Sequence, residues 1–430
     1  MPPSPLTLFD RQLEIAAWLW CEIRTVSLPA DRWLGSFFHH ERNRFGAQDR
    51  RFYAETMYSL FRNKIFLKTW AEEIFPEGDE KFLVFLAVIR ESLVSPDLIM
   101  EFSGNKNWPL TNGMVKAICA QQLPSKIEKS GLPPSEILPM RYSYPQWLID
   151  RWIKIHGLET CQKLLETAHE RPPFVERANP VKISREALME KFSGQEFRVK
   201  ETPQSPYGII FEERANLFDS EEFRGGLFEI QDEGSQLLCT AMEPKPGELI
   251  WDACAGGGGK TLLLAALMQN KGRIIATDIR AKKLDELAQR AKRAGIYNIF
   301  PADLNRMSEI SHARKGFDKI LVDAPCSGTG TLRRNPDAKW KLSEKRILEC
   351  QKDQLAILET VLPYLRKGGR IYYATCSMEP EENEEVMKEF LKLHPGLKPV
   401  AAGKNEEFLR LFPHLDQTDG FFLGIAENQV

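Results

Sequence analysis

The second half of the sequence alternates short apolar stretches with longer amphipathic ones, and this alternation limits the possible folds more than any other feature. The apolar stretches have the length of β-strands, and the stretches between them are long enough for the helical crossovers that parallel strands need. Five strands are expected, at residues 249–252, 273–278, 299–303, 318–323 and 370–375. The pattern predicts a doubly wound α/β sheet over residues 231–430.

Each of the five expected strands ends at or beside an acidic residue or a cysteine. These residues are Asp252, Asp278, Asp303, Asp323 and Cys376. In doubly wound sheets, ligands bind beyond the carboxyl ends of the strands. The sequence therefore predicts that the chemistry takes place at these five ends.

The first half of the chain has a different character. From residue 9 to about residue 124 the apolar residues recur at helical spacing, and Pro-rich pairs between residues 123 and 145 indicate a linker. The following residues combine one expected helix, over 147–168, with short strand-like runs, as in a small α+β unit. We expect three parts: a helical domain with its linker over 1–140, an α+β subdomain over 141–230 and the sheet domain over 231–430.

The overall charge gives no sign of a nucleic-acid partner. The 430 residues, enough for two or three domains, include 58 basic and 60 acidic side chains and have a formal net charge of -2. Locally the balance differs, because residues 42–68, 271–293 and 333–352 each carry an excess of basic side chains. These runs predict separate basic patches along which a phosphate backbone could lie.

The sequence also restricts the compartment and the metal content. No apolar stretch approaches the roughly 18 residues of a membrane span, and the N-terminus lacks the pattern of a secretory signal. The eight cysteines form no Cys-x-x-Cys pair, so neither a zinc site nor a disulfide framework is indicated. We expect a cytoplasmic protein that binds neither a membrane nor a metal.

A glycine-rich loop joins the first expected strand to the next helix. It spans Asp252 to Thr261, and its glycines allow a ligand to approach the backbone at a helix N-terminus. A phosphate-binding P-loop needs glycine where this chain has Cys254. Dinucleotide and S-adenosylmethionine sites instead need an acid at the end of the next strand, and Asp278 stands there, 18 residues after Lys260. A ligand-free glycine turn is the alternative here, and Asp303 could instead cap a helix.

Two cysteines follow neighbouring motifs at strand ends. Cys326 lies in Asp323-Ala-Pro-Cys-Ser-Gly-Thr-Gly, and Cys376 lies in Ala-Thr-Cys-Ser. A thiolate that adds to C6 of cytosine turns C5 into a nucleophile able to accept a methyl group, and a nearby acid such as Asp323 can bond the base edge. A single strand-end cysteine is usually a small buried apolar residue, but two in these contexts favour a reactive pair.

These motifs resemble those of the RsmB-like (Sun/Fmu) family of S-adenosylmethionine-dependent RNA cytosine-C5 methyltransferases. The third motif, Tyr-x-Thr-Cys-Ser followed by Glu382 and Asn383, belongs to the same resemblance. It implies that Cys376 is the nucleophile, that Cys326 helps to release the product and that Asp323 contacts the base. The cofactor S-adenosylmethionine would be held by the following residues: Cys254, Ala255, Gly256, Gly257, Gly258, Gly259, Lys260, Asp278, Asp303 and Asp323. One departure is Gly256-Gly257, where the family usually has Ala-Pro.

The N-terminal helices resemble the NusB-like RNA-binding domain of RsmB-like members, and the segment around Arg177-Ala-Asn-Pro resembles their small α+β subdomain. The resemblance implies a Rossmann-like methyltransferase sheet and an RNA substrate, and we expect that RNA to be 16S ribosomal RNA of the small subunit. A tRNA substrate is one alternative. A P-loop ATPase and a non-catalytic ribosome assembly factor are two others.

Overall fold

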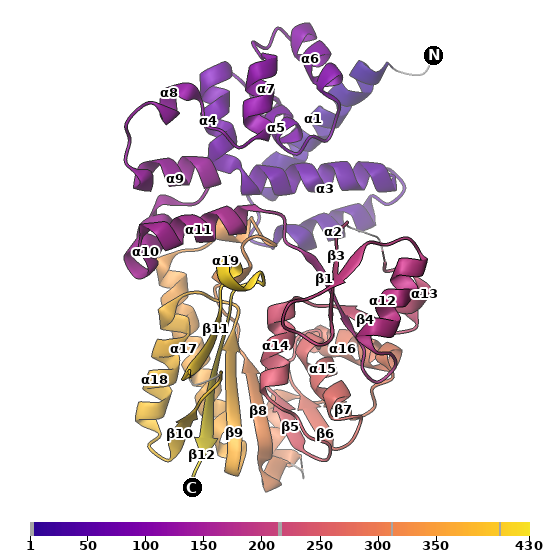
Figure 1. Ribbon diagram of the computed structural model, residues 1–430, viewed down its shortest axis with the longest axis vertical. Coiled ribbons are helices and arrows are strands. Elements are labelled where there is room, and N and C mark those ends of the chain that lie inside the picture. Colours follow the sequence, from indigo (N-terminus) through magenta and orange to yellow (C-terminus); the bar gives the residue numbers. More distant parts are fainter. Residues whose placement is uncertain (1–3, 214–216, 311–312, 404–405) are drawn as a thin grey trace. The chain divides into compact units, whose positions relative to one another are not determined.

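The computed structural model describes residues 4–213, 217–310, 313–403 and 406–430 (Figure 1). The chain forms two compact units. The helical unit comprises residues 1–171 and 332–341, and the sheet unit comprises residues 172–331 and 342–430. Within the described ranges, every helix is too short or too polar to cross a membrane.

The helical unit is built around one helix that is apolar on all sides. This helix is α5 (Glu80–Arg90), in which residues 82–89 are all buried. Asp79 caps it by accepting the N–H of Phe82 at 3.0 Å. The other helices of the unit are α1 (Pro5–Ile23), α2 (Ala30–His40), α3 (Ala47–Arg62), α4 (Lys64–Ile74), α6 (Pro96–Asn105), α7 (Asn112–Cys119), α8 (Ser125–Glu128), α9 (Pro134–Tyr142), α10 (Gln146–His156) and α11 (Leu158–His169).

The single helix expected over 147–168 is wrong. Gly157 has a φ of 80°, in the left-handed half of backbone space, and it separates α10 from α11. Both helices belong to the helical unit. The predicted all-helical N-terminal region is confirmed.

Ten residues from the second half of the sequence, 332–341, complete the helical unit. Asp337 accepts the N–H of Ala30 at 3.0 Å, at the first residue of α2, where a negative charge is favourable. The Nε1–H of Trp340 donates to the carbonyl of Phe61 at 2.7 Å, and its ring packs on the helical core. Lys339 donates to the carbonyl of Arg62 at 3.1 Å. These buried bonds attach the segment to α2 and to the end of α3.

The sheet unit begins with a small antiparallel sheet of order β2-β3-β1-β4. One face of this sheet is covered by α12 (Arg185–Gly194), whose Leu188 and Phe192 share a core with strand residues. A short helix, α13 (Glu221–Arg224), precedes the last strand. The strands are β1 (Phe174–Ala178), β2 (Val199–Glu201), β3 (Gly208–Phe211) and β4 (Phe228–Ile230).

The main sheet has the order β10-β12-β9-β8-β5-β6-β7, with β11 paired to β12 (Figure 1). The five expected strands are all present and pair in parallel, which confirms the doubly wound sheet. They are β5 (Leu249–Asp252), β6 (Arg273–Ala276), β7 (Ile299–Pro301), β8 (Phe317–Asp323) and β9 (Leu365–Thr375). Because β6 and β7 end two residues before Asp278 and Asp303, these two acids lie in loops and not in strands.

Three strands at the C-terminus were not expected. They add to β9 in antiparallel fashion through β12. These strands are β10 (Leu397–Val400), β11 (Phe408–Leu411) and β12 (Phe421–Asn428), with the short helix α19 (Pro413–Asp416) before the last.

Helices cover both faces of the main sheet. Alternate strand residues such as Ile250 and Trp251 belong to two different cores, one on each face. The first core contains residues of α14 (Glu233–Ala241), α15 (Gly259–Leu267) and α16 (Ala281–Ala294). The second contains residues of α17 (Glu344–Val361) and α18 (Glu384–Leu393).

Candidate active site

The glycine loop turns sharply between β5 and α15. Gly258, the N-cap of α15, has a φ of 82°, and a Cβ there would lie 2.0 Å from Cδ1 of Leu287. Gly256 also has a positive φ, of 52°. Only glycine fits at position 258 without moving the Leu287 side chain of α16, so the close approach of the loop to that helix requires glycine there.

Two arginines hold the carbonyl groups of this loop. Arg177, on β1, is fully buried and donates to the carbonyl of Gly259 at 2.9 Å and to the side chain of Gln231. Arg290, on α16, donates to the carbonyl of Gly257 at 2.6 Å. The small sheet, through β1, and the helix α16 thus fix the loop together.

A cavity of about 320 Å³ lies beside the glycine loop. Its wall includes Cys254 and Asp278 together with the apolar side chains of Ile279, Leu304 and Pro325. The Asp278 carboxylate accepts the N–H of Gly256 at 2.9 Å. It also accepts the backbone N–H of the residue two positions on, at 2.8 Å. An oriented carboxylate at the edge of an apolar pocket suits a ligand with a hydroxyl group and a planar ring.

Lys260 and Asp323 form an ion pair that the sequence did not indicate. The Nζ of Lys260 lies 2.7 Å from Oδ2 of Asp323, and the lysine side chain is only 12% exposed. Burial alone would lower the pKa of Lys260, but the adjacent Asp323 carboxylate raises it above its usual range. The lysine stays charged and is directed to Asp323, which disfavours the P-loop alternative because the lysine of a P-loop binds phosphate.

Cys326 and Cys376 lie together at the ends of the parallel neighbours β8 and β9. Their Sγ atoms are 3.3 Å apart, and both are free, half-buried thiols. The hydrogen bond to Cys376, followed by burial, raises the pKa of Cys326 well above its usual range. Cys326 therefore keeps its proton and can donate it to Cys376. Pro325, one residue before Cys326, lines the cavity described above.

Glu382 ties the two cysteine loops to each other. Its buried carboxylate accepts the N–H of Ser327 at 2.8 Å and the hydroxyl of Ser377 at 2.6 Å, and it also accepts the Ser327 hydroxyl. Gln354 donates to it at 3.1 Å. Asn383 donates to the carbonyl of Ser377 at 2.9 Å. Glu382 and Asn383 belong to a motif in the sequence, but no role could be assigned to them from it, because their partners are known only from the fold.

Two family models match this chain. Residues 239–426 match the model described as 16S rRNA methyltransferase RsmB/F, and residues 144–217 match the ferredoxin-like domain of RsmF/B-like methyltransferases. The two together cover more than half of the sequence. The chain belongs to the RsmB/F methyltransferase family.

Individual relatives agree with this assignment. The chain is 29% identical over 416 residues to the probable ribosomal RNA small subunit methyltransferase B of Bacillus subtilis (strain 168), covering 89% of this chain and 91% of that protein. It is 33% identical over 285 residues to ribosomal RNA small subunit methyltransferase B of Escherichia coli O127:H6, but the alignment covers 66% of each chain, just under two thirds. A solved methyltransferase homolog from Pyrococcus horikoshii is 30% identical with a TM-score of 0.61, covering 69% of this chain and 99% of that one.

The fold of this RsmB/F family member brings most of the predicted site residues together. Cys254 and Asp278 share the cavity, Lys260 pairs with Asp323, and the two cysteines are in contact. Ala255 donates its N–H to the carbonyl of Thr277 at 2.9 Å and so fixes the loop beside β6.

Asp303 is placed differently from the other acids. It is exposed and accepts the N–H of Asn305 at 2.9 Å, as the cap of a short 3-10 helix over Leu304–Glu309. The capping alternative therefore describes its contacts, and its role in cofactor binding stays a prediction. The division of the chain into three domains also stays a prediction.

Proposed function

We propose that this protein transfers a methyl group from S-adenosylmethionine to C5 of a cytosine in RNA, and that the RNA is the 16S ribosomal RNA of the small subunit. The observation that carries the proposal is the pair of thiols at 3.3 Å beside the glycine-loop cavity. Family membership supports methyl transfer to ribosomal RNA. The two thiols support the choice of C5, because that carbon becomes nucleophilic only after a thiolate adds to C6.

The cavity beside the glycine loop fits the adenosine part of S-adenosylmethionine. Ile279, Leu304 and Pro325 would contact the adenine ring, and the Asp278 carboxylate would accept the ribose hydroxyl protons. Arg177 and Arg290 would hold the loop beside that cavity through the carbonyls of Gly259 and Gly257. When bound, S-adenosylmethionine supplies the methyl group as an electrophilic carbon.

Cys376 is the proposed nucleophile. As a thiolate it would add to C6 of the cytosine, and the Sγ–C6 bond would give C5 the electron density to take the methyl group. A base would then remove the C5 proton, and the Sγ–C6 bond would break to restore the ring double bond. Cys326 keeps a proton and bonds to Cys376. It would therefore act as the hydrogen-bond donor that holds Cys376 in place, and it would assist the elimination.

Asp323 is the proposed contact to the base. Its Oδ2 already accepts from Lys260, which keeps the carboxylate oriented, and the remaining lone pairs are available for the amino group of a flipped cytosine and for its N3 once N3 carries a proton. This contact would strengthen as Cys376 adds, because addition makes N3 more basic and a protonated N3 donates to the carboxylate.

The experiment compares Cys376→Ala with Cys326→Ala. Cys376→Ala should abolish transfer of radiolabelled methyl groups from S-adenosylmethionine to 16S rRNA. Cys326→Ala should allow addition and methylation but slow elimination, so that a protein–RNA adduct accumulates on a denaturing gel. Cys21→Ala, another half-buried free thiol, is the matched control and should behave as the wild type.

The opposite pattern, in which Cys376→Ala forms the adduct, would show that the roles are reversed. Bisulfite mapping of RNA from cells with and without the protein would identify the methylated cytosine. A signal in tRNA and none in 16S rRNA would contradict the proposed substrate and leave the chemistry intact.

A further inference from the structure

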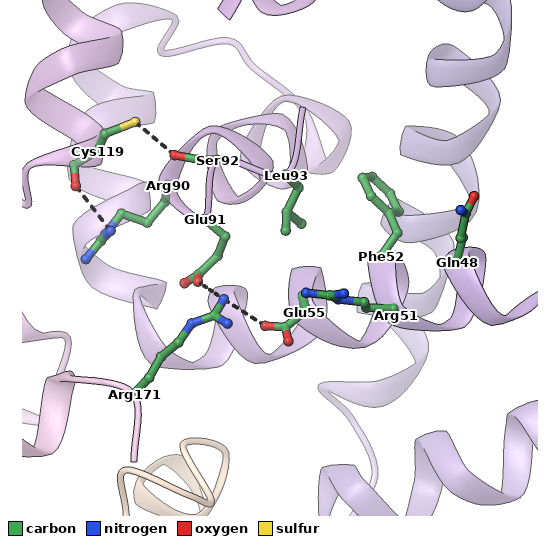
Figure 2. Close-up of a pocket in the computed structure, with 10 residues that line it drawn as sticks. All are labelled: Gln48, Arg51, Phe52, Glu55, Arg90, Glu91, Ser92, Leu93, Cys119 and Arg171. Carbon is green, nitrogen blue, oxygen red and sulfur yellow. Dashed lines mark hydrogen bonds and ion pairs between the residues drawn. The ribbon is translucent and has the colours of Figure 1, made fainter. Parts of the chain in front are cut away.

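A second cavity, larger than the one beside the glycine loop, lies within the helical unit (Figure 2). Its volume is about 610 Å³, and it is formed by α3, by the end of α5 with the residues that follow, by Cys119 at the end of α7 and by Arg171. Neither family model covers α3 or α5, and the proposed methyl transfer does not use this cavity. Its size is within the range of about 300–1,000 Å³ that is typical of small-ligand sites.

Three arginines and two glutamates line the cavity, which leaves it with a net positive charge. Arg171 donates to Glu55 at 2.9 Å and to Glu91 at 2.7 Å, so one guanidinium joins both carboxylates. Arg90 donates to the carbonyl of Cys119 at 3.2 Å and to the side chain of Gln121, and burial lowers its pKa. Two of the three arginines are therefore already bonded to the protein.

Arg51 differs from the other two. Its side chain is exposed and extends over the cavity from α3, and it makes no hydrogen bond or ion pair with any described residue (Figure 2). A guanidinium of this kind matches the geometry of a phosphate group, because its parallel N–H groups donate to two oxygens. The cavity thus presents one uncommitted anion ligand.

The rest of the wall suits a planar, partly apolar group. Phe52, next to Arg51, is half-buried, and its ring borders the cavity together with Leu93. Unpaired bases stack on aromatic rings in single-stranded RNA sites, and this stacking contributes about 1–3 kcal/mol per base. Glu55 and Glu91 can accept N–H groups from a base edge, which a site for a simple inorganic anion would not need.

We propose that this cavity binds one unpaired nucleotide of the RNA substrate, with Arg51 on its phosphate and Phe52 against its base. The inference rests on the proposed function, because it takes RNA as the substrate. Residues 42–68, which include both side chains, carry seven basic and two acidic residues, so the neighbouring surface favours the flanking phosphates. The helical unit would then capture the RNA at a position distinct from the methylated cytosine.

The test measures RNA binding without turnover. The full-length Cys376→Ala protein, with and without Arg51→Gln, is titrated into a short fluorescein-labelled single-stranded RNA and into the same sequence as a duplex. Arg51→Gln should weaken single-strand binding about 5- to 20-fold and lower the slope of log affinity against log salt by about 1. Duplex binding should change much less, since a paired base cannot enter the cavity.

Matched variants separate the site from general electrostatics. Arg50→Gln removes the charge of the neighbouring arginine on α3, whose side chain does not line the cavity. This change should weaken binding less than 3-fold, because a charge outside the cavity contributes only a general attraction to phosphates, which salt screens. Phe52→Leu keeps an apolar side chain but removes the ring, and should weaken single-strand binding. Circular dichroism melting should be unchanged in Arg51→Gln, because the side chain is exposed and has no partner among the described residues.

Equal losses for Arg50→Gln and Arg51→Gln, or equal losses for single strand and duplex, would overturn the proposal. A site for free nucleotide would instead bind adenosine monophosphate in calorimetry through Arg51 while RNA affinity stayed unchanged, which would also overturn it. The result of this binding test does not depend on whether the protein transfers methyl groups. If the wild type methylated no RNA and Arg51→Gln still selectively weakened RNA binding, the proposed function would fail and this site would stand.

Discussion

The two cavities of this molecule differ in whether the protein holds every charged group at the site. Beside the glycine loop, Lys260 is paired with Asp323, and Asp278 accepts two backbone N–H groups. In the helical unit, Arg51 extends over the cavity without a protein partner among the described residues. Groups that are fixed before a substrate arrives suit chemistry, since they need no reorganisation in the transition state. A solvated guanidinium such as that of Arg51 suits the capture of an RNA chain whose position varies.

We expect the largest effect on the rate from a substitution of Glu382. This substitution tests whether the fixed position of the two cysteine loops matters for the reaction. Glu382→Ala removes the acceptor for Ser327 and Ser377, so both cysteine loops lose their common support. Misplacement of reacting groups by about 1 Å can lower a rate about 100-fold, and we expect a fall in kcat of that order with a small change in KM. Methyl transfer under saturating RNA measures this.

Two variants control the Glu382 prediction. Glu385→Ala, on the exposed side of α18, should leave kcat unchanged. Glu382→Gln keeps one carbonyl acceptor and should recover part of the rate. A change in KM alone for Glu382→Ala would contradict the positioning role.

Gly258 tests the rigidity of the loop itself. An alanine at this position has a φ of 82° and a Cβ 2.0 Å from Leu287, so left-handed strain and overpacking together should reduce stability by about 2–5 kcal/mol. Gly368→Ala is the matched control, because Gly368 has a φ of 72° and no atom within 4 Å of the added Cβ. Urea unfolding should show a loss of about 1–2 kcal/mol there. Equal losses at the two positions would mean that α16 yields and that the loop is not held by close packing.

Glu176 is a buried ionisable group, whereas Arg51 is exposed to solvent. A substitution of Glu176 therefore tests what burial of such a group costs in stability. It lies on β1, fully buried, and neither carboxylate oxygen has a hydrogen-bond partner among the described residues. Burial raises its pKa to about 9. Between the unfolded pKa and the folded one, the unfolded chain releases a proton that the folded chain keeps, so stability falls as the pH rises through this window.

Glu176→Gln should remove that fall. The variant should match the wild type near pH 5 and exceed it near pH 8 by about 1–2 kcal/mol, or several degrees in melting temperature. Thermal unfolding across this pH range is the measurement. A constant difference at all pH values would show that Glu176 is ionised in the folded protein.

The parts of the sheet unit that the sequence predicted are those carried by local patterns. The glycine loop, the five parallel strands and the two cysteines each depend on residues close together in the chain, or on strand ends that a parallel sheet must bring to one edge. The ion pair between Lys260 and Asp323 was not predictable from the sequence. The two residues are 63 positions apart, and another acidic side chain or a backbone carbonyl could equally have been the partner of the lysine. Glu382 was missed for the same reason, since its carboxylate bonds both loops only after β8 and β9 pair.

The errors concern short or interrupted elements. Gly157 ends one helix and begins another, although the apolar spacing on either side continues. The C-terminal strands β10 and β11 are four residues each, too short to stand out from loop sequence, and they are stabilised by pairing with β12. The attachment of residues 332–341 to the helical unit depends on tertiary bonds alone.

That attachment has a consequence for synthesis of the chain on the ribosome. The helical unit starts at the N-terminus, yet Asp337 and Trp340, which bond α2 and the end of α3, are made only after about 170 further residues. At about 5–20 residues per second this is a delay of roughly 10–30 s. Of the two units, the helical one begins to emerge earlier but is completed only late, and a chain cut after Arg171 would lack the piece that finishes its core.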